Sequence, residues 1–157
     1  MHQNRYSCVQ DDHIHLIVEA SNRAAMSSGM RSVNSRIGKG MNIRLGRERG
    51  QVIPDRYHEQ HLGSPRQVRN TLAYVLNNVR KHVLQEMAQT CEWNWLDPCS
   101  SAEYFDGWKH KDPVPIDKHA PVSAPRTWLL KKLWRKHRLI DINAIPGPAY
   151  SAAYSAK

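Results

Sequence analysis

The chain has 157 residues and a mass of 18.1 kDa, the size of one domain with its own core. Apolar residues make up 40% of it, and no apolar run approaches the roughly 20 residues of a membrane span, which argues against a disordered or membrane-spanning protein. The formal net charge of +9 favours a polyanionic partner.

The first predicted element is a β-hairpin. A β-prone run ends at Val9, residues 10–12 have the composition of a turn, and residues 13–20 alternate in polarity. Because strand side chains alternate between two faces, the two histidines of this run share a face. One face carries Ile14, Leu16 and Val18, and the other carries His13, His15, Ile17 and Glu19.

A helix is predicted next, from an N-cap at Ser21 to Leu45, with Gly38 and Gly40 as the place where it would break. Residues 50–63 then predict a short edge strand interrupted by Pro54. The apolar stripe of the helix consists of Met26, Met30, Val33, Ile37, Met41 and Leu45.

The strongest helix-start signal is Ser64, Pro65 and Gln67, which combine an N-cap, a proline at the first helical position and a glutamine three residues after the cap. We expect this helix to run to Met87. Its buried stripe would consist of Val68, Leu72, Val75, Val79 and Val83.

The remaining chain predicts loops, a basic helix at Thr127–Leu139 and a frayed tail after Pro146. The loops would be anchored by Trp93, Trp95, Phe105 and Trp108, and the helix by Leu129, Leu130, Leu133 and Trp134.

The cysteines Cys8, Cys91 and Cys99 fit neither a disulfide framework nor a paired zinc motif, so we expect reduced core thiols. The amino terminus shows no export pattern, which makes the cytoplasm the default location.

Basic residues gather in two segments, around residues 21–50 and 126–138, and we expect them to contact phosphates. The alternatives are solvated helix faces or, for the last helix, an amphipathic membrane-surface helix. The candidate phosphate contacts are Arg36, Lys39, Arg56, Arg80, Lys81, Lys131, Lys132, Arg135, Lys136 and Arg138.

Two imidazoles on one strand face lie close enough to bind a single ion, although an isolated H-x-H is weak evidence and ordinary hydrogen-bonded histidines are the alternative. On the helix that follows Ser64, Tyr74 and Asn78 are i, i+4 neighbours on one flank. Neutral ligands would leave the charge of Mg²⁺ or Mn²⁺ uncancelled, and a phenol can attack phosphorus to form a covalent intermediate. Tyr57 is the rival nucleophile and Asn77 the rival amide.

"DDHIHLIVEA" resembles the histidine-hydrophobe-histidine motif of the IS200-like single-strand transposases, and "RYH" followed by "SPRQVRNTLAYVLNNVRKH" resembles their tyrosine-bearing helix. The similarity is greatest to the REP-associated tyrosine transposase branch and covers about residues 4–140. It implies an α+β, ferredoxin-like antiparallel sheet with helices packed on it, recognition of hairpin DNA, and cleavage of one strand through a 5′-phosphotyrosine. By motif, Tyr74 would be the nucleophile, and His13, His15 and Asn78 the Mg²⁺ or Mn²⁺ ligands.

We expect a catalytic core at residues 1–90, an extension with the basic helix at 91–146 in the same domain, and a flexible tail at 147–157. The family has a further strand and helix before the hairpin, so we expect an N-terminally truncated chain whose sheet exposes backbone groups. Two alternatives stay open: a catalytically inactive hairpin nucleic-acid-binding protein, and a hydrolytic nuclease in which water replaces the tyrosine. Single-stranded or hairpin DNA is the expected partner, with no membrane, and the chain would be a monomer or homodimer.

Overall fold

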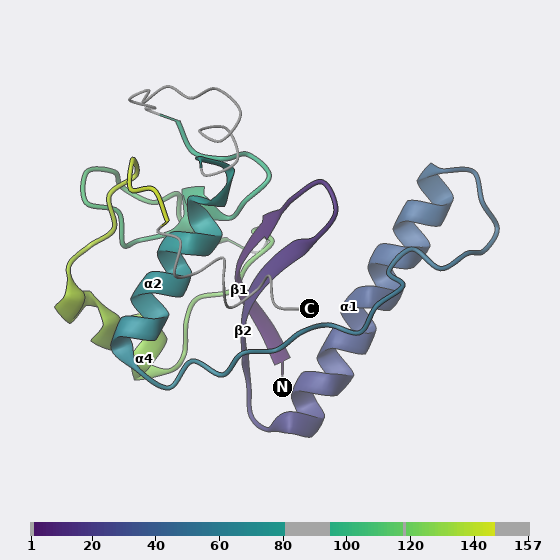
Figure 1. The fold of residues 1–157 in the computed structure, drawn as a ribbon, viewed down its shortest axis with the longest axis horizontal. Helices are drawn as coiled ribbons and strands as arrows, with labels where there is room; N and C mark the ends of the chain where they lie inside the picture. The colour runs from purple at the N-terminus through teal and green to yellow at the C-terminus, as the bar shows by residue number, and fades with distance from the viewer. Residues whose placement is uncertain (1, 81–94, 118, 147–157) are drawn as a thin grey trace. The chain divides into compact units, whose positions relative to one another are not determined.

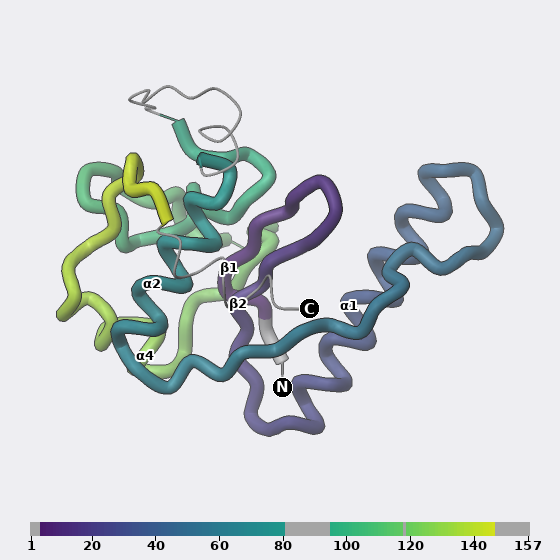
Figure 2. Tube along the Cα trace, viewed as in Figure 1, coloured from purple at the N-terminus to yellow at the C-terminus, as the bar shows by residue number. Residues whose placement is uncertain are grey.

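The computed structural model describes residues 2–80, 95–117 and 119–146 (Figures 1 and 2). Within them the chain has the predicted α+β class, with a two-stranded antiparallel sheet, whereas its ferredoxin-like arrangement stays a prediction. No described helix is both long and apolar enough to cross a membrane. The elements are β1 (His2–Val9), β2 (Ile14–Ala20), α1 (Arg23–Arg44), α2 (Pro65–Leu76), η1 (Ala102–Tyr104), α4 (Trp128–Lys131) and η2 (Leu133–His137).

Contacts divide the chain into two units, the first made of residues 1–3 and 19–61 and the second of residues 4–18 and 62–157. The first is built on α1, whose N-cap is Asn22 rather than the predicted Ser21. The Asn22 side chain accepts a hydrogen bond from the backbone N–H of Ala25 at 2.8 Å. The helix runs unbroken through Gly38 and Gly40, so the break considered there does not occur.

The segment after α1 returns along the helix as an extended chain, which the tubes of Figure 2 make easy to follow. The Asn42 amide donates to the Gly50 carbonyl at 2.9 Å, and the hydroxyls of Ser27 and Tyr57 lie 3.1 Å apart. The prediction of an edge strand here is wrong, because these bonds join the segment to helix side chains and residues 50–63 contain no strand.

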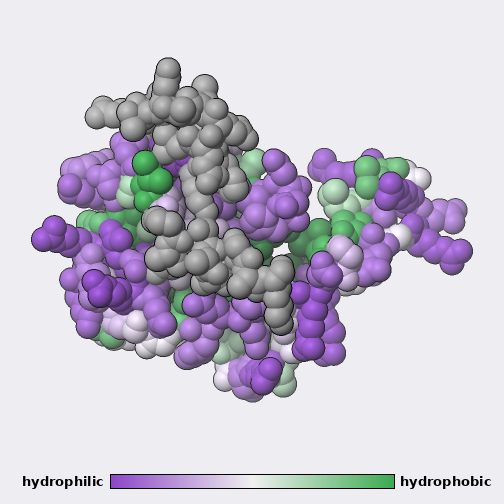
Figure 3. Space-filling view, viewed as in Figure 1, coloured by the Kyte–Doolittle hydropathy of each residue, from purple (hydrophilic) through white to green (hydrophobic). Residues whose placement is uncertain are grey.

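The predicted apolar stripe of α1 is only partly covered. Met30 is buried, whereas Met41 and Leu45, at the end of the stripe, are exposed, as is Ile43 beside them. Figure 3 shows apolar surface in green among hydrophilic surface in the region of α1.

The second unit holds the main core, and the hairpin contributes one face to it. Gln10 N donates to the His13 carbonyl at 2.9 Å, which closes the predicted turn. Tyr6, Cys8 and Ile17 are buried in the same apolar cluster, whereas Ile14 is 37% exposed. The core-facing side of β2 is therefore the one that also carries the histidines.

Helix α2 packs on this face and begins as the sequence predicts. The Ser64 hydroxyl accepts from Gln67 N at 3.2 Å while the Gln67 side chain accepts from Ser64 N at 3.0 Å, a complete capping box before Pro65. Val68, Leu72 and Val75 are buried as expected.

The predicted helix is interrupted, because α2 ends at Leu76 and the chain bends at Asn77, and its predicted end at Met87 lies outside the described residues. The Asn77 amide donates to the carbonyls of Asp141 at 3.2 Å and Ala144 at 2.9 Å, bonds that hold the bend in place. Residues 78–80 are helical again, and Val83 lies outside the described residues.

The predicted basic helix is also divided, into α4 and η2, with the break at Lys132. Leu130 and Trp134 are buried as predicted, and Leu129 packs against the core, but Leu133 is exposed. Both short helices pack on α2.

Two of the predicted loop anchors are confirmed, since Phe105 and Trp108 are buried and pack edge to face with ring centroids 5.1 Å apart. Trp95 is 37% exposed, with the Arg80 guanidinium 5.7 Å from its ring centroid, and Trp93 lies outside the described residues.

The edge of β1 that faces away from β2 is paired with residues 99–101. Val9 N donates to the Cys99 carbonyl at 2.9 Å, and Ser101 N donates to the Ser7 carbonyl at 2.8 Å. These bonds form an antiparallel bridge between Cys8 and Ser100. The backbone groups of Ser7 and Val9, which the sequence suggested would be exposed at a sheet edge, are therefore paired.

Cys8 is a reduced thiol in the core, as predicted, whereas Cys99 is reduced but exposed, and Cys91 lies outside the described residues. Burial, reinforced by the negative charge of Asp97, raises the pKa of the Cys8 thiol to about 12.

This raised pKa predicts a loss of stability in alkali. Between about pH 9, where the thiol of the unfolded chain ionises, and about pH 12, the folded chain keeps a proton that the unfolded chain has lost, so stability falls as pH rises. Urea unfolding at pH 8 and pH 10 should show a loss of about 1 kcal/mol from this group. Cys8→Ala should remove that part of the pH dependence and Cys99→Ala should leave it; an unchanged dependence in Cys8→Ala would contradict the assignment.

Candidate functional site

The two histidines of the H-x-H pattern face each other at the start of β2, in the second unit. His13 is the residue before the strand and His15 is its second residue. Their Nε2 atoms lie 3.0 Å apart, and the rings meet edge to face with centroids 4.6 Å apart. At this distance one Nε2 donates a hydrogen bond to the other, so the two ring nitrogens lie side by side.

A carboxylate orients the first imidazole. The Nδ1 atom of His13 lies 2.5 Å from Oδ1 of Asp12, so Nδ1 carries the proton and donates it to the carboxylate. The Nε2 lone pair of His13 is then directed at His15. This is the arrangement in which an outer carboxylate fixes the tautomer and raises the basicity of a metal-binding histidine.

Tyr74 completes the contact between the hairpin and α2. Its ring and that of His15 meet edge to face, with centroids 5.1 Å apart and planes at 74°. The residue is 6% exposed and lies near the end of α2, two residues before Leu76. Of the predicted site residues, His13, His15 and Tyr74 are thus joined in one chain of ring contacts.

The two neighbouring asparagines behave differently. Asn77 uses its amide to hold residues 141 and 144, as described above. Asn78 is fully buried, and neither its Nδ2 nor its Oδ1 has a hydrogen-bond partner among the described residues. Burying an amide without a partner costs free energy, so such a group in a native fold calls for a ligand or a bound water. Asn77 is therefore structural, and Asn78 is the amide that remains for binding.

The spacing of the two imidazole nitrogens fits a divalent metal ion with six ligands. In an octahedral site with ligands about 2.1 Å from the ion, two adjacent ligand atoms lie about 3.0 Å apart, which matches the separation of the two imidazole nitrogens. Among the described residues no group of three or more His, Cys, Asp or Glu side chains could hold a metal. An ion at the histidine pair would therefore need a ligand of another type, such as a carboxamide or phosphate oxygen.

Two of the predicted phosphate contacts are bonded within the protein. Arg80 is buried, its guanidinium donates to the Trp95 carbonyl at 2.7 Å, and burial lowers its pKa. Arg135 binds the Asp106 carboxylate at 2.8 Å. Lys81 lies outside the described residues. The remaining candidates are exposed: Arg36, Lys39, Arg56, Lys131, Lys132, Lys136 and Arg138.

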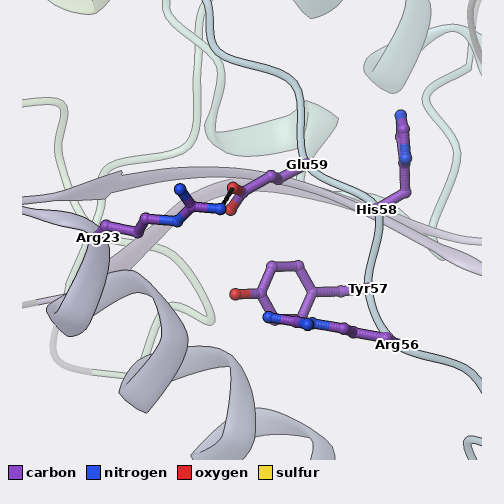
Figure 4. Close-up of a pocket in the computed structure, with 5 residues that line it drawn as sticks. All are labelled: Arg23, Arg56, Tyr57, His58 and Glu59. Atoms are coloured by element: carbon purple, nitrogen blue, oxygen red, sulfur yellow. Dashed lines mark ion pairs between the residues drawn. The ribbon is translucent and has the colours of Figure 1, made fainter.

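The rival nucleophile Tyr57 lies in the first unit, in a pocket of about 240 Å³ (Figure 4). Arg23 and Glu59 form one wall as an ion pair with 3.7 Å between charged atoms. The Tyr57 hydroxyl points toward α1, where Ser27 lies 3.1 Å away, and His58 points away from it. The pocket places two arginines near a phenol, but it lacks a second imidazole.

Sequence reasoning missed the role of Asp12. The signal was present, since an acidic residue directly precedes the H-x-H pattern, but turn chemistry accounted for that aspartate without a second role.

No family model matches the chain, and no curated protein or solved structure matches it significantly.

Proposed function

We propose that this protein nicks and rejoins single-stranded DNA at hairpin repeat sequences, as a metal-dependent tyrosine transposase of the REP-associated type. The observation that carries the proposal is the chain of contacts from Asp12 through His13 and His15 to Tyr74. A ferredoxin-like core belongs to the same proposal.

The chemistry assigned to Tyr74 is a transesterification. Its phenol oxygen attacks the scissile phosphorus, the bond from phosphorus to the 3′ oxygen breaks, and the phenol proton leaves while the 3′ oxygen gains one. The product is a 5′-phosphotyrosine and a free 3′ hydroxyl, and the reverse reaction with a 3′ hydroxyl rejoins the strand without an energy source.

His13, His15 and Asn78 would hold Mg²⁺ or Mn²⁺, which supplies Lewis-acid polarisation of the phosphate when bound. Asp12 keeps the His13 nitrogen in its metal-binding tautomer. The exposed basic residues would hold the DNA backbone without reading its sequence.

The proposal is tested by incubating the chain with a hairpin-bearing single strand and Mn²⁺. A strand labelled at its 3′ end should give a labelled protein adduct on a denaturing gel, whereas a strand labelled at its 5′ end should give only a shortened product. Binding without an adduct would favour the non-catalytic hairpin-binding protein.

The metal site itself predicts a binding result that needs no DNA. In Mn²⁺ titrations followed by electron paramagnetic resonance, His13→Ala should lose the bound ion, and Asp12→Asn should weaken binding about 10- to 100-fold because the tautomer is no longer fixed. His110→Ala, a change at an exposed histidine outside this site, is the matched control. Equal Mn²⁺ affinity in all of these variants would remove the metal site from the proposal.

A further inference from the structure

Trp128 is the most exposed of the tryptophans that the structure describes. It is 61% exposed, whereas Trp108 and Trp134 of the same unit are 4% and 1% exposed. An indole left in water contributes nothing to the core, and exposed tryptophans are characteristic of binding surfaces.

The two buried tryptophans show what a structural indole does in this fold. Trp108 Nε1 donates to the Ala102 carbonyl at 2.8 Å, and Trp134 Nε1 donates to the Leu130 carbonyl at 3.0 Å. Both rings also pack against Phe105. Among the described residues, Trp128 makes neither kind of contact, and 61% of its surface stays exposed.

The backbone that carries Trp128 is nevertheless fixed. Trp128 is the first residue of α4, whose N-cap Thr127 accepts a hydrogen bond from Leu130 N at 3.3 Å. Leu130 is buried in the core, and Lys132 N donates to the Trp128 carbonyl at 2.9 Å. A ring on a fixed backbone loses little conformational entropy when a ligand packs on it.

The surroundings of the ring are positively charged. The Lys132 ammonium lies 5.4 Å from the centroid of the Trp128 ring, a cation–π contact, and Lys131 is exposed beside it. Residues 118–140 contain no Asp or Glu at all. An aromatic face flanked by lysines matches the two needs of a single nucleic-acid strand, a surface for a base and cations for the phosphates.

We infer that Trp128 is a stacking platform for an unpaired base of a single-stranded nucleic acid, with Lys131 and Lys132 binding the adjoining phosphates. The choice of a nucleic acid as the partner rests on the proposed function. Stacking itself requires neither a metal ion nor Tyr74, so the two can fail separately. The platform lies on α4, which packs on the same helix α2 that carries Tyr74.

The test is equilibrium binding in the presence of a chelator, followed by fluorescence anisotropy. A labelled oligothymidylate is compared with an abasic strand of the same length, which keeps the phosphates and lacks the bases. Trp128→Ala should weaken binding of the oligothymidylate about 5- to 150-fold and leave binding of the abasic strand unchanged. Trp128→Phe should keep most of the affinity, because a phenyl ring still stacks.

Leu133→Ala is the matched control, since Leu133 is an exposed apolar residue of the same surface. It should bind the oligothymidylate like the unmodified chain. Equal affinity of Trp128→Ala and the unmodified chain for oligothymidylate would overturn the inference, and so would an equal loss on both strands. Loss of binding to phosphatidylserine vesicles, with oligothymidylate binding unchanged, would instead identify a membrane-surface helix.

The adduct assay with Mn²⁺ separates this inference from the proposed function. A chain that binds through Trp128 but forms no adduct would overturn only the enzyme. An adduct that forms with a Trp128→Ala chain of undiminished affinity would overturn only the platform.

Discussion

Replacing Tyr74 with phenylalanine is expected to abolish the covalent protein–DNA adduct, a fall of about 10³-fold or more, because the attacking oxygen is absent. The ring that contacts His15 edge to face is kept in this variant, so the packing between α2 and the hairpin should survive. Adduct formation with the 3′-labelled hairpin strand measures the effect, and circular dichroism verifies the fold.

Tyr57→Phe is the matched control, since it removes the phenol of the other tyrosine that lies among basic residues. It should form adduct at an unchanged rate. An adduct that persists in Tyr74→Phe would contradict the assignment of the nucleophile. Cleavage without any adduct in Tyr74→Phe would identify the hydrolytic alternative, in which water attacks.

Gly107→Ala is expected to destabilise the protein by about 3 kcal/mol or more, the upper end of overpacking effects. A Cβ at this position would lie 2.3 Å from an atom of the Trp134 ring and 2.4 Å from the tip of the Phe105 ring. Those rings are stacked at 24° to each other and almost completely buried, so neither can move aside without displacing the core. Urea unfolding would measure the loss.

Gly40→Ala provides the control for the same chemical change. Gly40 lies inside α1, and a Cβ there would meet no atom within 4 Å. This variant should be more stable by about 0.5–1 kcal/mol, because alanine loses less backbone freedom than glycine in a helix interior. Similar changes in stability for the two substitutions would show that crowding around Gly107 does not cause the loss.

The features that were predicted correctly depend on residues close together in the sequence. The start of α2 follows from Ser64, Pro65 and Gln67, whose interactions span four positions of the chain. The shared face of His13 and His15 follows in the same way from the alternation of a strand.

Several features that the sequence did not predict involve partners that are distant in sequence. The bend at Asn77 is held by hydrogen bonds to the carbonyls of Asp141 and Ala144, more than sixty residues later in the chain. No sequence pattern near Asn77 predicts these bonds. The hairpin face that enters the core was decided by packing against α2, which also brought Tyr74 to His15. The unsatisfied amide of Asn78 could not be predicted from the sequence either, because burial of a polar group depends on the complete fold.

The pairing of β1 with residues 99–101 has a consequence for how the chain folds during synthesis. The hairpin partner of β1 follows it immediately, but the bridge from Cys8 to Ser100 closes a loop of about ninety residues. At ribosomal rates of about 5–20 residues per second, the outer backbone groups of β1 stay unpaired for on the order of ten seconds, until residues 99–101 are synthesised. The nascent strand is thus open to pairing with other chains during that interval, and slow translation of residues 20–100 would prolong it.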